Sequence, residues 1–126
     1  MADAIKAKRL DLKLTKVELA KILEVSPLTI STWENINKQP VPRMMKKIIV
    51  WLGYVPHLDV DMSTLGGQLY IYRCKHGLTQ KDIAIELQID RWAVTKVEKG
   101  IEIETNHINK LRRLIGFDLH NQRSKK

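Results

Sequence analysis

Cysteine and long apolar stretches are nearly absent from this chain of 126 residues. The single cysteine, Cys74, cannot form a disulfide within the chain and is typical of a reducing compartment, so we expect a cytoplasmic protein. The longest apolar stretch, around residues 48–55, is too short to cross a membrane. Near the N-terminus, Lys6, Lys8 and Arg9 interrupt any apolar run. We therefore expect no membrane partner.

Patterns that carry catalysis or bind metals are also missing. No nucleophile is accompanied by a base, no carboxylates are paired, and no glycine-rich phosphate loop is present. The pair formed by Cys74 and His76 is too small for a metal site. The other histidines, His57, His107 and His120, show no ligand spacing. These absences predict a protein that is not an enzyme and that uses neither a metal nor another cofactor.

Positive charge, by contrast, is abundant. Lys and Arg number 22 against 14 Asp and Glu, which leaves a formal charge of +8. This sign is expected of a protein that binds a polyanion such as DNA. Hydrophobic residues make up 44% of the chain, which is enough for a core, so we expect a folded rather than a disordered chain.

An internal repeat is found when the chain is shifted by 64 residues against itself. Six residues recur unchanged, namely Arg9 and Arg73, Leu14 and Leu78, Thr15 and Thr79, Ala20 and Ala84, Leu23 and Leu87, and Glu34 and Glu98. The repeat predicts two units of one fold. Their expected boundaries are 1–54 for the first unit, 55–64 for a linker, 65–119 for the second unit and 120–126 for a basic tail.

Each unit is expected to contain about four helices, so the fold class is predicted to be all-α. Thr15 and Thr79 are expected to begin the second helices, each followed three residues on by a carboxylate in the pattern of a capping box. Ser26 and Asp90 are the expected N-caps of the third helices. The first helices are expected at about 4–12 and 65–75. The third helix of the first unit is expected from Pro27 to about Asn35. The fourth helix is expected to begin after Pro40 or Pro42 and to close at Gly53 in the first unit, and to run from Thr105 to its close at Gly116 in the second.

Helix ends and burial follow from the same patterns. We expect Gly77 to supply a stop for its helix that Lys13 does not supply. Apolar residues at helical spacing are expected in the core, namely Leu19, Leu23, Ile30, Trp33 and Trp51. Cys74 aligns with Leu10, so it is expected to be a small buried hydrophobic residue.

A resemblance to a known family rests on two segments. The first runs from Leu14-Thr15-Lys16 through Ala20 to Ile30-Ser31-Thr32-Trp33-Glu34, and the second from Leu78-Thr79-Gln80 through Ala84 to Val94-Thr95-Lys96-Val97-Glu98. Both resemble the helix-turn-helix of the Cro and lambda-repressor-like (XRE-type) family. The resemblance implies a compact helical domain whose third helix enters the major groove of DNA. It also implies the ion pairs Arg9–Glu34 and Arg73–Glu98, which the retention of both partners in both repeats independently favours.

Two positions depart from the family pattern. Glu24 and Gln88 stand in the tight turn where the family often has glycine, and a positive φ there costs a larger residue roughly 1 kcal/mol. Lys16 stands where the family often has glutamine, whereas the second repeat keeps Gln80.

The residues expected to face DNA divide into two groups. At about 100° per residue, Ile30 and Trp33 turn toward the core together, and so do Val94 and Val97. The outward residues, which we predict to read bases, are Leu28, Ser31 and Thr32 in the first unit and Arg91, Trp92, Thr95 and Lys96 in the second. Phosphate contacts are predicted for Lys16, Gln80, Arg43, Lys46, Lys47, Lys110 and Arg113, although the fourth-helix residues among them could equally form a solubilising surface.

The two repeats are not expected to read DNA equally well. An Arg or Lys side chain on guanine is the commonest specific contact, and only the second repeat offers one, in Arg91 and Lys96. Two alternatives stay open at this point: these two residues could contact only phosphates, and Trp92 could pack against the first unit.

These observations favour a transcriptional regulator, repressor-like, that binds double-stranded DNA through two helix-turn-helix units in one chain. Two recognition helices on one face of DNA lie about 34 Å apart, and a linker of roughly ten residues spans at most about 33 Å. The alternative is an antitoxin-like or coactivator-like module that binds protein through the outward apolar residues Leu28 and Trp92. A homodimer or a protein partner is compatible with either function.

Overall fold

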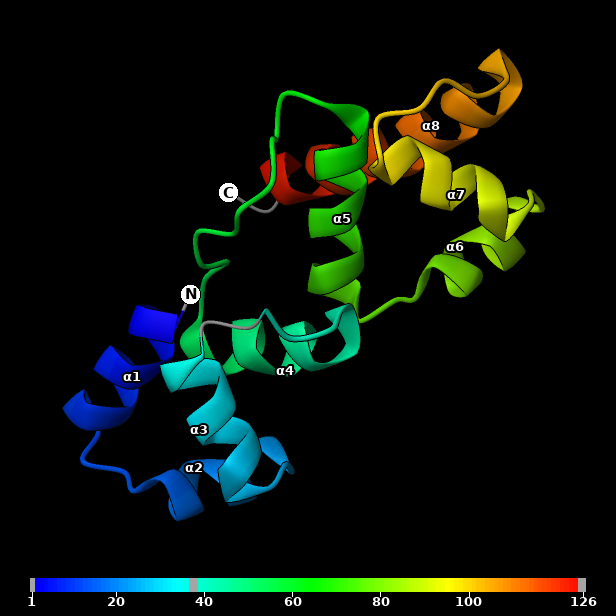
Figure 1. Ribbon diagram of the computed structural model, residues 1–126. Helices are drawn as coiled ribbons and strands as arrows, with labels where there is room; N and C mark the ends of the chain where they lie inside the picture. The colour runs from blue at the N-terminus through cyan, green and yellow to red at the C-terminus, as the bar shows by residue number, and fades with distance from the viewer. Residues whose placement is uncertain (1, 37–38, 125–126) are drawn as a thin grey trace.

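The computed structural model describes the backbone of residues 2–36 and 39–124 and the side chains as far as residue 116. Within these ranges the chain forms eight α-helices and no strand, so the predicted all-α class is confirmed (Figure 1). The helices are α1 (Ala2–Asp11), α2 (Lys16–Leu23), α3 (Pro27–Asn35), α4 (Pro42–Leu52), α5 (Leu65–His76), α6 (Gln80–Leu87), α7 (Arg91–Glu98) and α8 (Thr105–Ser124).

A capping box begins both α2 and α6, as the sequence predicts. The Thr15 hydroxyl accepts a hydrogen bond from the Glu18 N–H (3.1 Å), and the Glu18 carboxylate accepts one from the Thr15 N–H (3.0 Å). Thr79 and Asp82 repeat these bonds at 3.0 and 2.9 Å. In both boxes the hydrogen bonds from the threonine, the backbone one first, lower the pKa of the carboxyl group. Four backbone and side-chain groups at each helix start are therefore satisfied locally.

The tight turns after α2 and α6 use left-handed residues that are not glycine. Glu24 has φ 58° and Gln88 has φ 56°. In each turn the backbone N–H of the following residue donates to an alanine carbonyl, Val25 to Ala20 at 2.9 Å and Ile89 to Ala84 at 3.0 Å. The strained backbone is thus held by the same hydrogen bond in both repeats.

The end of α1 differs from the sequence prediction. Lys13 adopts φ 58°, close to the 68° of its counterpart Gly77, so Lys13 also supplies a helix stop. The reason is a backbone hydrogen bond from Leu14 to the Arg9 carbonyl (2.9 Å), which closes α1 in the way that Leu78 closes α5. This bond offsets part of the cost of about 1–2 kcal/mol that a side chain adds to a left-handed residue.

The second unit departs from prediction at two helix ends. Asp90 occupies the N-cap of α7 with an extended backbone, but its carboxylate caps no N–H group. The prediction that a helix closes at Gly116 is wrong, because α8 continues to Ser124. Gly53 ends α4 with φ 85° and is followed by Pro56, whereas no proline follows Gly116. Residues 120–124 of the predicted tail are therefore helical in their backbone, and 125–126 lie outside the described residues.

Two hydrophobic clusters fill the interior, one for each repeat. The first includes Ile5, Leu19, Leu23, Ile30, Trp33, Met45, Ile48 and Leu52. The second includes Leu69, Ile83, Ala84, Val94, Val97, Leu111 and Ile115. Trp51, predicted to be a core residue, is only partly buried beside the first cluster, and the Lys8 ammonium lies 5.3 Å from its ring centre.

Helix α5 belongs to both clusters. Leu69 lies in the second cluster, whereas Cys74, which is fully buried as predicted, lies in the first. Leu58, from the segment predicted to be a linker, is also buried in the first cluster. The packing of α5 on α4 therefore joins the two repeats through a shared hydrophobic contact. The boundaries 1–54, 55–64 and 65–119 stay a prediction.

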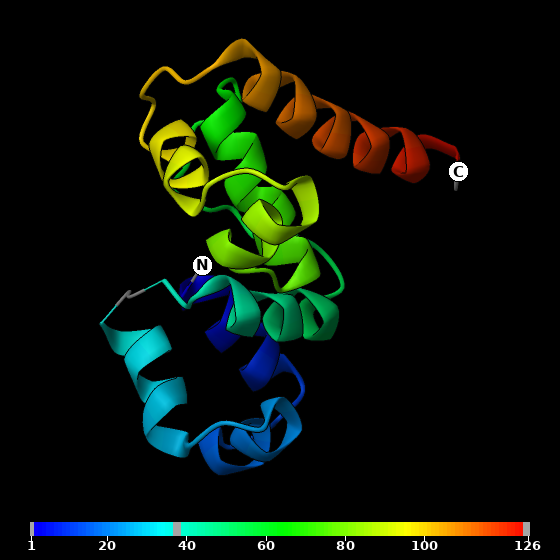
Figure 2. The same ribbon diagram turned by 90° about the vertical axis from the view of Figure 1, so that its right-hand side faces the viewer.

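The two sets of four helices are arranged in a similar way in space. In Figures 1 and 2, α5 runs roughly as α1 does and α8 roughly as α4 does, whereas α7 is tilted relative to α3 without being reversed. Figure 2 also shows α3 and α7 along the same side of the molecule, at the left, with the other helices to their right.

Candidate nucleic-acid interface

Helices α3 and α7 each have one buried side and one exposed side. Ile30 and Trp33 of α3 are buried in the first cluster, and Val94 and Val97 of α7 are buried in the second. Ala20 and Ala84 are also buried, where α2 and α6 pack against these helices, and their small side chains allow the backbones to approach. The residues predicted to face outward therefore lie on the sides that the cores leave free.

The exposed side of α3 is short of hydrogen-bond donors. Leu28 is 76% exposed. The Thr32 hydroxyl donates to the Leu28 carbonyl at 3.0 Å, and Ser31 accepts a hydrogen bond from the Lys16 ammonium at 3.2 Å. Lys16, predicted to contact phosphate from the start of α2, is thus brought together with Ser31 of α3.

The exposed side of α7 carries two cations and a tryptophan. Trp92 is 63% exposed, so it does not pack into the first unit as one alternative had it. The Lys96 ammonium lies 3.5 Å from the centre of the Trp92 ring, in a cation–π contact. Arg91 is exposed and is joined by no ion pair among the described residues. Its guanidinium keeps all its donors for a ligand.

A chain of hydrogen bonds orients Gln80 beside this surface. The Thr95 hydroxyl donates to the Gln80 side-chain oxygen at 2.6 Å, and the Gln80 amide donates to Glu98 at 3.0 Å. Glu98 in turn accepts two bonds from Arg73, each 2.6 Å long. Gln80 and Thr95, predicted for phosphate and base contact respectively, are therefore preorganised by one network.

An ion pair joins the first helix of each repeat to the third, at the positions that the sequence predicts. Arg9 donates to Glu34 at 2.8 and 2.9 Å, and both side chains are less than a tenth exposed. The hydrogen bond to Glu34 raises the pKa of Arg9 further above its ordinary value. Arg73 and Glu98 form the matching pair. Both arginines also donate to the carbonyl of the leucine five residues on, at 3.0 and 3.3 Å.

Two basic residues of α4 and α8 serve helix ends. The Lys47 ammonium lies 3.4 Å from the Leu23 carbonyl at the end of α2, and that of Lys110 lies 3.2 Å from the Leu87 carbonyl at the end of α6. Each lysine therefore compensates the negative end of a helix dipole. This equivalent role was not predicted, because it depends on how the fourth helix lies across the second.

Arg43 and Lys46 lie toward the second repeat. The positive charge of Arg43 adds to the Thr79 hydrogen bonds in lowering the pKa of Asp82 at the start of α6. The Lys46 methylene groups lie against Gly77, so close that a Cβ atom there would be 3.0 Å from Lys46 Cδ. Arg113 on α8 is exposed. Of the predicted phosphate-binding residues on α4, Lys46 therefore contacts the junction between the repeats.

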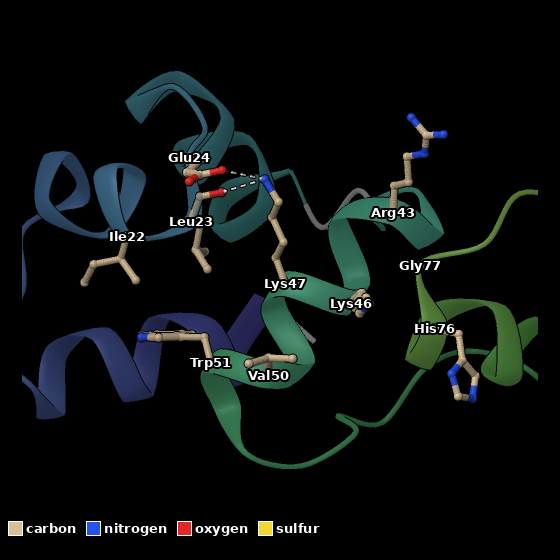
Figure 3. Close-up of a pocket in the computed structure, with 10 residues that line it drawn as sticks. All are labelled: Ile22, Leu23, Glu24, Arg43, Lys46, Lys47, Val50, Trp51, His76 and Gly77. Atoms are coloured by element: carbon tan, nitrogen blue, oxygen red, sulfur yellow. Dashed lines mark hydrogen bonds and ion pairs between the residues drawn. The ribbon is translucent and has the colours of Figure 1, made fainter. Parts of the chain in front are cut away.

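A surface groove of about 700 Å³ opens beside this junction (Figure 3). Its lining comes from α2, α4 and the end of α5, with apolar Ile22, Val50 and Trp51 beside basic Lys46 and Lys47. No residue of α3 or α7 lines it. The groove is thus separate from the exposed sides of α3 and α7, but three residues predicted to contact phosphate line it, namely Arg43, Lys46 and Lys47.

Comparison with known families identifies the first repeat. Residues 5–57 match the family described as Helix-turn-helix, a range that runs from α1 through α4. This part of the chain is therefore similar to helix-turn-helix proteins, a family that binds double-stranded DNA. No curated protein and no solved structure matches the chain.

Two other kinds of feature are absent from the described part of the chain. None of the helices there combines the length and apolar character needed to span a bilayer. The same part of the chain holds no group of three or more His, Cys, Asp or Glu side chains arranged to hold a metal ion.

Proposed function

We propose that this chain is a cytoplasmic, repressor-like transcriptional regulator that binds a specific double-stranded DNA sequence with two recognition helices, α3 and α7. One observation carries the proposal. The second repeat reproduces the main structural contacts of the helix-turn-helix in the first repeat, which is similar to a DNA-binding family. The capping box, the left-handed turn and the buried ion pair are present in both.

The two helices differ in the chemistry that they offer to bases. The exposed side of α7 carries Arg91 and Lys96, and either can donate to guanine O6 and N7, a contact worth about 1–3 kcal/mol of discrimination. The exposed side of α3 carries Leu28 and two hydroxyl groups that already have partners. We propose that α7 reads most of the sequence and that α3 contributes mainly apolar contact to a thymine methyl group.

Phosphate contacts would position both helices without reading sequence. Lys16 and Gln80 lie at the first positions of α2 and α6, where backbone N–H groups and the helix dipole also favour an anion. Arg113 is exposed on α8 and could add a contact, whereas Lys47 and Lys110 would first have to leave their helix-capping positions.

Selection of bound fragments from a random pool of duplex DNA tests the proposal. Enrichment of one motif is expected, and the affinity for it should fall steeply with salt, with a slope near 0.9 for each phosphate neutralised. Enrichment of no motif, together with an affinity that is flat between low and moderate salt, would contradict DNA binding.

Single variants on the enriched site test the division of labour. Arg91→Ala should relax preference at one or two base pairs, and Lys6→Ala on α1, which removes the same charge from an exposed position, should leave the preferences unchanged. A phosphate role for Arg91 would instead weaken all sequences equally and reduce the salt slope. If Thr32→Ala relaxes specificity more than Arg91→Ala does, α7 is not the main reader.

The alternative function is a protein-interaction module. Its support is the exposure of Leu28 and Trp92, both large and apolar. One face of the Trp92 ring is already covered by Lys96, which reduces the apolar area available to a partner. This function would be favoured by two results together. The substitution Leu28→Ser abolishes binding to a protein partner, and selection with the unaltered chain enriches no DNA sequence over a control selection without protein.

A further inference from the structure

We infer that the two recognition helices read a direct repeat, in which two unlike half-sites point the same way along the DNA, rather than a palindrome. This inference rests on the proposed function and adds to it the architecture of the bound sequence. It follows from the way in which the two repeats of the chain are related in space.

The internal geometry of the two repeats is the same at the points that set the third helix. In both, a buried Arg–Glu pair ties that helix to the first, and the left-handed turn sets its angle to the second. The outward side of α7 therefore has the same relation to its own unit as the outward side of α3. How the two outward sides are related to each other then depends only on the relation between the units.

That relation is not a two-fold reversal. In Figures 1 and 2, α5 and α8 run roughly as α1 and α4 do, and α7 is tilted relative to α3 but not reversed. Figure 2 shows α3 and α7 along one side of the molecule. In a symmetric dimer, a two-fold axis reverses one recognition helix relative to the other, and the operator is correspondingly palindromic. Without that reversal, both helices approach DNA with their N-terminal ends in the same sense.

The relation between the units is held by packing rather than left to a free linker. Cys74 of α5 is buried in the first cluster, and Tyr70 packs against the same cluster while its hydroxyl accepts a hydrogen bond from Gln39. Lys46 lies against Gly77 at the same junction. The distance and angle between the half-sites should therefore be fixed.

The orientation of the half-sites is easiest to determine when both helices recognise the same bases. A variant in which both helices carry the same outward residues provides this, and we call it the graft. The variant Pro27→Arg/Leu28→Trp/Ser31→Thr/Thr32→Lys gives α3 the outward residues of α7. The fold should tolerate the exchange for two reasons. Leu28 is 76% exposed, and the substitution Ser31→Thr keeps the hydroxyl group that accepts the hydrogen bond from Lys16. The reverse graft, Arg91→Pro/Trp92→Leu/Thr95→Ser/Lys96→Thr, gives α7 the residues of α3 and serves if the first variant does not fold.

The experiment selects bound fragments from a random duplex pool, once with the unaltered chain and once with the graft. The graft is expected to enrich one short sequence that occurs twice in the same orientation. The unaltered chain is expected to enrich two different sequences in a fixed order. A probe with the direct arrangement should then bind the graft about 100-fold more tightly than the same half-sites inverted, because only the direct arrangement engages both helices. Insertion of five or of ten base pairs between half-sites should remove this gain.

Each contrary result has a distinct meaning. An inverted repeat would overturn the inference, as would a single half-site or equal binding to direct and inverted probes, and all three would leave DNA binding intact. Tolerance of the ten-base-pair insertion would show that the junction does not hold the units together, and it would also overturn the inference. Enrichment of no sequence by the unaltered chain would refute the proposed function itself.

Discussion

The substitution Glu98→Gln should destabilise the protein severely, because it removes one charge of a buried ion pair and leaves the other. The Arg73 side chain is 7% exposed and that of Glu98 is 11% exposed, and two hydrogen bonds of 2.6 Å join them. Arginine does not lose its proton in proteins, so the guanidinium stays charged when its counter-ion is gone. Its remaining protein acceptors are the Leu78 carbonyl and one amide oxygen.

The expected loss is about 3 kcal/mol of unfolding free energy. Removing one partner of a buried pair costs about 3–5 kcal/mol, and the slight exposure of Glu98 favours the lower end of this range. Because small proteins are stable by only about 5–15 kcal/mol, the change should be plain in a urea titration followed by circular dichroism. The isosteric change keeps the shape of the site, so lost packing contributes little.

Two controls separate charge from shape. Glu34→Gln makes the same change in the first repeat, where the carboxylate is 1% exposed, and should cost at least as much. The double variant Arg73→Met/Glu98→Leu removes both charges and should recover most of the lost stability. A loss below about 1 kcal/mol for Glu98→Gln would mean that the pair behaves as a solvated surface contact, and the reasoning would be refuted.

Three further predictions concern backbone strain and titration. Gln88→Gly should raise the unfolding free energy by about 0.5 kcal/mol, because the relief of the positive φ exceeds the cost of a more flexible unfolded chain. Gln88→Ala keeps the strain and should not raise it. Equal effects of the two substitutions in urea titrations would disprove the strain. The pKa of Asp82 is lowered by its capping hydrogen bonds, so its carboxylate stabilises the fold above about pH 4 and this contribution is lost as the pH falls through the folded value. Asp82→Asn should therefore lower the Tm at pH 7 and flatten its decline between about pH 5 and 3, and an unchanged decline would argue against the box. Burial raises the pKa of Cys74 to about 11, so its thiol should resist alkylation at pH 8 until urea unfolds the chain, and stability should fall as the pH rises above about 9; rapid labelling of the folded protein would contradict its burial.

The sequence alone determined the features that rest on local chemistry. Both capping boxes depend on a threonine and a carboxylate three residues apart, a spacing that the helix itself brings together. The two Arg–Glu pairs could also be predicted, because their recurrence 64 residues apart ties them to the repeated fold. The left-handed conformation of Glu24 and Gln88 was expected from the resemblance to a family that often has glycine in this turn.

Tertiary structure alone decided the contacts between elements that are distant in the sequence. That Cys74 completes the first core from the second repeat depends on how α5 packs against α4, and so does the position of Leu58. The sequence around Lys47 and Lys110 does not distinguish a lysine that caps a helix end from one that binds phosphate, and only the fold shows their contacts with helix ends. The orientation of the two units has the same origin: side-chain shapes from both repeats must fit together at one junction, and no spacing within either repeat encodes that fit.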